Sequence, residues 1–285
     1  MPMDVQRIAA FSTGPEGGNP AGVVLLQEDL TTKDMARIAA EVGYSETAFA
    51  VAKDDTGNAW RVRYFSPESE VPFCGHATIA LGAALGQHHG AGTYALELNN
   101  SAITVDATPA DDAMDSAMMA TLSSPPTKSS AIQPQELEDA MALFGLTSDD
   151  LDPRLAPARI HGGADHILLP LKNRATLAAM SYDLDAGRQV MRQHELVTIM
   201  LAYIETDQTF VVRNAFASGG VLEDPATGAA AAAFAGYLRD AGWPHGGALT
   251  IRQGEDMGSP SLIHVALDDT TGASVRVSGS ARAIG

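Results

Sequence analysis

Two apolar helices, each opening directly after a glycine-containing turn, constrain the fold of this 285-residue chain more than any other feature. The first turn is residues 73–75, and the apolar run after it predicts a helix over residues 76–85. The second turn is residues 223–228, and the alanine-rich run after it predicts a helix over residues 227–239. A helix that is apolar on every side must be buried. Each helix is therefore expected to lie inside a curled β-sheet.

The start of each predicted helix is also a potential anion site. The first N–H groups of a helix have no partner within the helix, and the helix dipole favours negative charge there. Each start carries an ionisable side chain, His76 in the first and Asp224 in the second. Asp224 followed by Pro225 is also a common helix cap, but Thr227 competes for that role and would free the Asp224 carboxylate. Together the two starts suggest a cleft that binds a small carboxylate between two halves of the chain.

The charge balance excludes one large class of partners. Thirty-five acidic residues against 18 Lys and Arg give a net charge of −17. Most of this surface would repel a polyanion, so we expect no binding to nucleic acid. No apolar run reaches the ~18–20 residues of a membrane span, and residues 1–20 contain no run of signal-peptide type. We therefore expect a cytoplasmic protein that makes no membrane contact.

Motifs typical of cofactor and metal enzymes are missing from the sequence. There is no Gly-Lys pair for a P-loop, no G-x-G-x-x-G and no G-x-S-x-G. The pair His194-Glu195 lacks the second histidine of a zinc peptidase motif. Cys74 is the only cysteine, which excludes internal disulfides and a multi-cysteine metal site. The sequence thus predicts a protein with neither a cofactor nor a bound metal.

The rest of the pattern predicts an α+β fold made of two similar β-rich halves, each wrapped around one of the apolar helices. The first half is residues 1–122, joined by a strand within residues 273–285, and the second is residues 123–272, with the Pro- and Ser-rich stretch 123–130 as linker. Alternating or continuous apolar runs predict strands over residues 5–11, 21–26, 46–52, 60–65, 93–98, 102–107, 114–122, 166–171, 195–204, 209–216, 249–252, 262–267 and 273–277. Further helices are expected over residues 32–42, 135–144, 175–180 and 187–194.

Four motifs in this order, Gly18-Asn19-Pro20-Ala21, the segment 45–49, the segment 71–78 and the segment 223–228, resemble the PhzF (phenazine biosynthesis) family. The resemblance implies a diaminopimelate-epimerase-like fold with the active site in the cleft between the two halves. It also implies a cofactor-independent isomerase that shifts a proton within a small carboxylate substrate, as in the isomerisation of dihydro-hydroxyanthranilate. A homodimer is implied in the same way.

The resemblance assigns roles to individual residues. Its catalytic residues fall on Glu46, His76 and Asp224. Independently, Glu46 leads a strand face with Ala48 and Ala50, so partial burial is expected. The groups expected to hold the substrate are Asn19, Ser45, Gly75, Gly228 and Ala229.

One position departs from the family pattern, and two other functions stay open. The family usually has serine where this chain has Ala229, so a hydroxyl expected to touch the substrate is missing. The first alternative is an epimerase or racemase of a small amino or hydroxy acid that uses either one base or the pair Cys74 and Asp224; a racemase with two thiols is excluded by the single cysteine. Cys74 on its own is most simply a small buried apolar residue. The second alternative is a non-catalytic metabolite-binding protein on the same fold.

Overall fold

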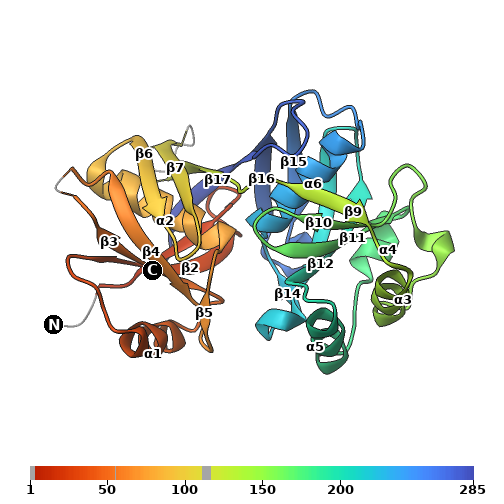
Figure 1. Ribbon diagram of the computed structural model, residues 1–285, viewed down its shortest axis with the longest axis horizontal. Helices are drawn as coiled ribbons and strands as arrows, with labels where there is room; N and C mark the ends of the chain where they lie inside the picture. The colour runs from red at the N-terminus through yellow and green to blue at the C-terminus, as the bar shows by residue number, and fades with distance from the viewer. Residues whose placement is uncertain (1–3, 55, 111–116) are drawn as a thin grey trace. The chain divides into compact units, whose positions relative to one another are not determined.

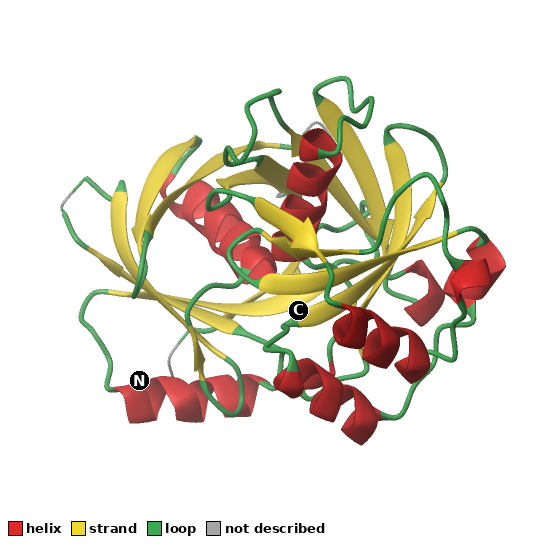
Figure 2. Ribbon diagram, turned by 45° about the vertical axis from the view of Figure 1, so that its right-hand side comes forward, coloured by secondary structure: helices red, strands yellow, loops and turns green. Residues whose placement is uncertain are grey.

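The computed structural model describes residues 4–54, 56–110 and 117–285. The described chain contains both strands and helices (Figures 1 and 2). The prediction of a fold that combines the two is therefore confirmed. The helices are α1 (Thr32–Val42), α2 (Gly75–His89), α3 (Pro134–Leu143), α4 (Arg174–Ala178), α5 (Leu184–Gln193) and α6 (Gly228–Asp240), with short 3-10 turns at Ser148–Asp150, Ala217–Gly219 and Glu255–Met257. Among the described residues, no helix combines the length and the apolar character needed to cross a membrane.

The strands are β1 (Gln6–Ala10), β2 (Asn19–Leu26), β3 (Thr47–Ala52), β4 (Ala59–Phe65), β5 (Glu70–Val71), β6 (Gly92–Glu97), β7 (Ala102–Pro109), β8 (Met118–Ser123), β9 (Lys128–Ala131), β10 (Ala158–His161), β11 (Asp165–Leu171), β12 (Thr198–Ile204), β13 (Thr209–Ala215), β14 (Glu223–Asp224), β15 (Ala248–Gln253), β16 (Ser261–Ala266) and β17 (Arg276–Ala283). The chain divides into two compact units. Unit 1 runs to Ser123 and resumes with Ser278–Gly285, and unit 2 is Ser124–Val277.

Unit 1 is built around the buried helix α2. Every residue from Gly75 to Gly86 is buried, because the run carries no charged side chain that needs water. The helix packs against β1, β2, β7 and β8 (Figure 1). Strands β2 and β3 pair in parallel, as do β4 and β6, while β1–β2, β3–β4, β6–β7 and β7–β8 are antiparallel. The segment 278–283 of β17 closes this unit by pairing with β1.

Helix α1 covers another part of unit 1. Thr31 caps it by accepting a hydrogen bond from the backbone N–H of Asp34, and Gly43 ends it with φ +73°. The residues Met35, Ile38 and Ala39 form its buried face, as their spacing predicts. They pack into one apolar cluster with strand residues that include Val24, Phe49 and Phe65. The helix therefore anchors β2, β3 and β4, and β3 is the strand that follows Glu46.

Unit 2 places a second buried helix, α6, against its own strands. This helix packs on β9, β10, β11 and β16, and its residues Ala230–Gly236 are all buried. Helices α3, α4 and α5 contribute to a separate cluster with Ile167, Leu169 and Leu171 of β11 (Figure 1). Since side chains alternate along a strand, His166 and Leu168 face the opposite side. Strand β11 is thus buried on both faces, which explains its nearly continuous apolar sequence.

Several sequence-based boundaries were wrong. The predicted linker 123–130 contains the first part of strand β9, and the strand predicted over residues 273–277 is instead β17, which begins at Arg276. The strand expected from residue 195 starts at Thr198. Of the strand expected over residues 114–122, residues 114–116 lie outside the described residues, and β8 begins at Met118.

Candidate active site

The turn before α2 brings Cys74 and His76 to the start of a rigid, buried helix. Cys74 is the residue before the helix and has an extended backbone (φ −142°, ψ 117°). Its carbonyl accepts hydrogen bonds from the backbone N–H of Thr78 (3.0 Å) and from the Thr78 hydroxyl (2.7 Å). Tyr64, fully buried on β4, places its hydroxyl 2.6 Å from the same Thr78 oxygen. The first turn is therefore locked, while the side chain of Cys74, the N-cap residue, makes no cap hydrogen bond.

Glu46 approaches this turn from the position just before strand β3. Its backbone carbonyl accepts a hydrogen bond from Gly22 (3.2 Å), next to the parallel pairing of β2 with β3. The side chain is 6% exposed, so the burial expected from the strand pattern is confirmed. The sheet thus fixes the position of a carboxylate that is almost fully buried.

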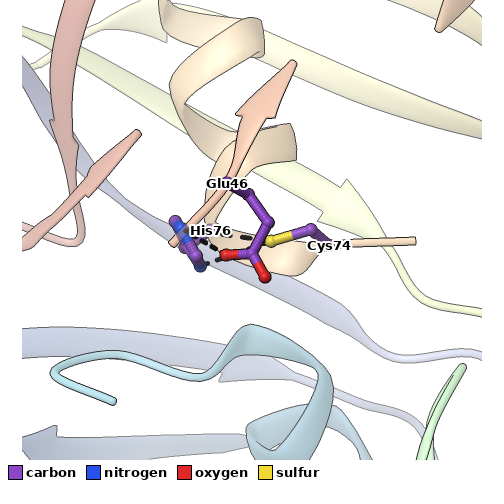
Figure 3. A group of neighbouring side chains, drawn as sticks. All are labelled: Glu46, Cys74 and His76. Atoms are coloured by element: carbon purple, nitrogen blue, oxygen red, sulfur yellow. Dashed lines mark hydrogen bonds and ion pairs between the residues drawn. The ribbon is translucent and has the colours of Figure 1, made fainter. Parts of the chain in front are cut away.

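Three ionisable groups meet at this point of unit 1 (Figure 3). The Glu46 Oε2 atom lies 3.4 Å from His76 Nε2. The Cys74 Sγ atom lies 3.3 Å from Nδ1 of the same imidazole. Ser45 Oγ is 3.3 Å from His76 Nε2 and adds a hydroxyl. A carboxylate, an imidazole and a thiol in contact can pass protons among themselves and to a bound molecule. The sequence named all four residues, and the structure brings them together.

Asn19 and Gly75, both expected to hold substrate, are also buried in unit 1. Asn19 is 2% exposed and opens β2, opposite Ala10 of β1. Gly18 before it has φ +87°, and a Cβ there would lie 2.8 Å from the Ala10 carbonyl oxygen, so only glycine fits this turn. Gly75 is the first residue of α2. The expected roles of Asn19 and Gly75 in substrate binding stay predictions.

A second cluster forms at the start of α6 in unit 2. Asp224 ends the two-residue strand β14, is 4% exposed, and its Oδ2 accepts a hydrogen bond of 2.6 Å from the Thr227 hydroxyl. Helix α6 begins at Gly228, so the interpretation of Asp224-Pro225 as a helix cap was wrong. Thr227 occupies the cap position, but its side chain makes no cap hydrogen bond. Gly228 is buried and Ala229 half-buried at this helix start.

No sequence pattern pointed to Gln253, which organises this second cluster. Gln253 is 1% exposed on β15. Its amide nitrogen donates to the Asp224 carbonyl (2.6 Å) and to the Thr227 hydroxyl (3.0 Å), and its oxygen accepts from the Thr227 N–H (3.1 Å). The three bonds hold the turn between β14 and α6. Strand β14 is also anchored by Arg213, whose Nε donates to Glu223 Oε1 (2.9 Å).

Relatives of this chain are named isomerases. An uncharacterized isomerase of Deinococcus radiodurans is 32% identical over 280 residues, which cover 96% of this chain and 90% of that protein. The trans-2,3-dihydro-3-hydroxyanthranilate isomerase of Pseudomonas chlororaphis is 30% identical over 259 residues, 90% of this chain and 87% of that protein. A crystal structure of the Bacillus anthracis phenazine biosynthesis protein, PhzF family, has a similar fold, with a TM-score of 0.83 at 22% identity over 99% of this chain and 97% of that one.

A protein-family model also matches this chain. The model described as phenazine biosynthesis-like protein, PhzC-PhzF, matches residues 8–284, nearly the whole chain. The resemblance expected from the four motifs is thereby confirmed. The chain belongs to the phenazine biosynthesis-like family, a family of isomerases.

Proposed function

We propose that this isomerase moves a proton from one atom of a small carboxylate substrate to another, without a cofactor, and that Glu46 is the group that carries the proton. The observation that supports this most directly is the buried Glu46 carboxylate 3.4 Å from the His76 imidazole, beside an uncapped helix start. A carboxylate fixed by a sheet and largely shielded from water is suited to take and return a proton at a defined point.

The neighbouring groups have separate roles in the proposal. His76 exchanges protons with Glu46 and keeps its carboxylate oriented. The first N–H groups of α2, beginning with that of Gly75, have no partner within the helix and bind the substrate carboxylate or the oxygen that becomes negative during the reaction. The family resemblance assigns Asp224 a catalytic role and Gly228 and Ala229 a substrate-binding role, and we propose that they have these roles in this chain.

The substrate class follows from the named relatives and from one substitution. The Pseudomonas chlororaphis relative is named for trans-2,3-dihydro-3-hydroxyanthranilate, a cyclic amino acid with a conjugated ring. We propose a substrate of that chemical class, a small carboxylic acid with a carbon acidified by conjugation. Ala229 offers an N–H but no hydroxyl, and the loss of one hydrogen bond costs about 1 kcal/mol. Turnover of the relative's own substrate is therefore expected to be weaker than that of a related acid that does not need this hydroxyl.

Glu46→Gln tests the proposal, because the amide keeps the shape of the side chain and removes its basicity. With trans-2,3-dihydro-3-hydroxyanthranilate and related cyclic acids in heavy water, followed by NMR, turnover should fall about 10²–10⁴-fold. Binding of small carboxylic acids, measured by thermal shift, should persist. The matched control is Glu41→Gln on α1, whose side chain is exposed and paired with Arg37. Unchanged turnover in Glu46→Gln would remove Glu46 from the mechanism.

The Cys74–His76 contact of 3.3 Å favours a second candidate, an epimerase in which the thiol is a base. The same heavy-water experiment separates the two. An isomerase yields product labelled at the atom that receives the proton, while an epimerase places deuterium at a stereocentre of an otherwise unchanged acid. Binding without any label in the acids tested would favour a metabolite-binding protein.

A further inference from the structure

The cluster of Glu46, Cys74 and His76 has the composition of a metal-binding site as well as of an acid/base site. Each residue offers one ligand atom, a carboxylate oxygen, a thiol sulfur and an imidazole nitrogen, and these three atoms lie within 4.8 Å of one another. All three residues are buried. Thiolate and imidazole together are ligands that Zn²⁺ and similar soft divalent cations prefer, and carboxylate completes a common three-residue set.

The distance between two of the three ligand atoms already matches tetrahedral coordination. Typical bond lengths to zinc place neighbouring nitrogen, oxygen and sulfur ligands about 3.3–3.5 Å apart. His76 Nε2 and Glu46 Oε2 are already 3.4 Å apart. Cys74 Sγ is 4.0 Å from the same nitrogen and 3.3 Å from Nδ1, so its side chain or the imidazole has to rotate to bring the sulfur to the Nε2 side of the ring. Figure 3 shows the three side chains turned toward one another from two chain segments.

The state of Glu46 is an independent sign that the cluster accepts a cation. Glu46 is 6% exposed, yet among the described residues its buried Oε2 receives no hydrogen bond; it lies 3.4 Å from His76 Nε2. A buried carboxylate oxygen without a hydrogen bond is costly unless a charge compensates it. One divalent cation would neutralise the Glu46 carboxylate and a Cys74 thiolate together.

We propose that Glu46, Cys74 and His76 bind one Zn²⁺ ion, with His76 acting through Nε2. Binding displaces the thiol proton to solvent, and three protein ligands leave a fourth position for water or a substrate oxygen. The ion then occupies the carboxylate that the isomerase needs, so zinc inhibits turnover. Only this last consequence rests on the proposed function; the binding itself does not.

Cobalt spectroscopy of the intact protein tests the binding without any substrate. The protein, prepared without a polyhistidine tag and treated with a chelator, is titrated with Co²⁺. The expected result is one equivalent bound, with a thiolate-to-cobalt charge-transfer band and the strong visible bands of tetrahedral cobalt, both lost when Zn²⁺ is added. Because Cys74 is the only cysteine of the chain, a thiolate band in the unaltered protein can arise only from this site. No such band, or binding without it, overturns the proposal.

Variants then identify the other ligands. Cys74→Ser should abolish the charge-transfer band. Glu46→Gln should keep the band but weaken cobalt affinity. Because Glu46 is proposed as a direct ligand, the loss of affinity should exceed the about 10–100-fold that is typical when a residue hydrogen-bonded to a ligand is removed. The control is His88→Gln, an exposed histidine near the opposite end of α2, which should leave affinity and spectrum unchanged. Equal affinity in Glu46→Gln and the unaltered protein overturns the three-residue site. Cobalt binding by a protein that proves inactive as an isomerase would contradict the proposed function alone.

Discussion

Gln253 acts on the backbone of Asp224 and on Thr227, the residue that donates to the Asp224 carboxylate. Its three hydrogen bonds go to the carbonyl of Asp224 and to the N–H and hydroxyl of Thr227. The Thr227 hydroxyl, which Gln253 contacts, donates a hydrogen bond to the Asp224 carboxylate. Gln253 thus helps to position that carboxylate through Thr227.

Gln253→Ala should therefore destabilise the protein by at least about 2 kcal/mol, since several buried polar groups lose their partners and each costs about 1–3 kcal/mol. Urea unfolding followed by circular dichroism measures the change. The control is Gln135→Ala on α3, whose exposed amide donates to Asp139 and whose removal should cost no more than about 0.5 kcal/mol. Equal effects of the two substitutions would contradict an organising role for Gln253.

The residues of the candidate site differ in how far the sequence could reveal them. Glu46, His76 and Asp224 stand in short contiguous motifs, so local sequence was enough to name them, and their catalytic roles stay predictions. Gln253 stands in a strand with no motif, 26 positions after Thr227 along the chain. Its importance arises only when β15 packs beside the turn before α6, and no local pattern encodes that contact.

Glycine and alanine let the elements around α6 approach more closely than larger residues would allow. A Cβ on Gly162, just after β10, would lie 2.7 Å from the backbone nitrogen of Ala233 and 3.0 Å from the Ala229 carbonyl oxygen. Those atoms belong to the helix backbone, which cannot move aside as a flexible side chain can. The position of the α6 start thus depends on the absence of one methyl group.

Gly162→Ala is expected to destabilise the protein by about 1–3 kcal/mol, the usual cost of overpacking. Thermal and urea unfolding test this. Gly92→Ala in β6 is the matched control, because a Cβ there meets no atom within 4 Å and the glycine does not have a positive φ. A stabilised Gly162→Ala protein would show that the helix can shift without cost.

At the level of elements, the sequence predicted best what local chemistry determines. The ends of α1 follow from a threonine cap and a glycine stop, and both apolar helices begin within one residue of their expected starts. The strands that escaped prediction are short or polar. Strand β9 reads Lys-Ser-Ser-Ala and is exposed along its whole length, and β14 has two residues. Such strands exist because of their pairing partners: β9 pairs with β10, which begins at Ala158, and β14 pairs with β13, which ends at Ala215.

On the scale of the whole molecule, one buried histidine makes the stability of unit 2 sensitive to acid. His166 is fully buried on β11. The Thr198 hydroxyl donates to Asn214 Oδ1 (3.2 Å), so His166 Nδ1, 2.7 Å from that hydroxyl, is the atom that carries the imidazole proton. Burial lowers the pKa of His166 from 6.5 to about 3. The unfolded chain therefore binds a proton that the folded chain rejects between these two pH values.

The sign of the resulting pH dependence follows directly. The contribution of His166 to the free energy of unfolding is intact above about pH 6.5 and falls as the pH drops toward 3. At about pH 4.5, two units below the unfolded pKa, the loss should be about 2–3 kcal/mol. His166→Asn should lower stability at pH 7 and remove this part of the acid-dependent loss. An equal loss with and without the imidazole would contradict the prediction.

The chain provides a reporter for that measurement. It has two tryptophans, Trp60 in unit 1 and Trp243 in unit 2. Trp243 donates to the Asp207 carbonyl (2.7 Å) and packs near Phe210. In a Trp60→Phe background, fluorescence therefore follows unit 2 alone. Unfolding of unit 2 can then be measured separately from that of unit 1. This matters because a chain with two compact units need not unfold in a single transition.

The route of the chain through its two units sets an order for folding during synthesis. Unit 2 is continuous in sequence, so all of it is available once Val277 has left the ribosome. Unit 1 needs residues 278–283 to complete β17 and pair with β1, whose residues Ile8–Ala10 were made more than two hundred residues earlier. The unit whose synthesis begins first is thus the last to be completed. Until residues 278–283 have left the ribosome, the edge of β1 that pairs with β17 is open to pairing with neighbouring nascent chains.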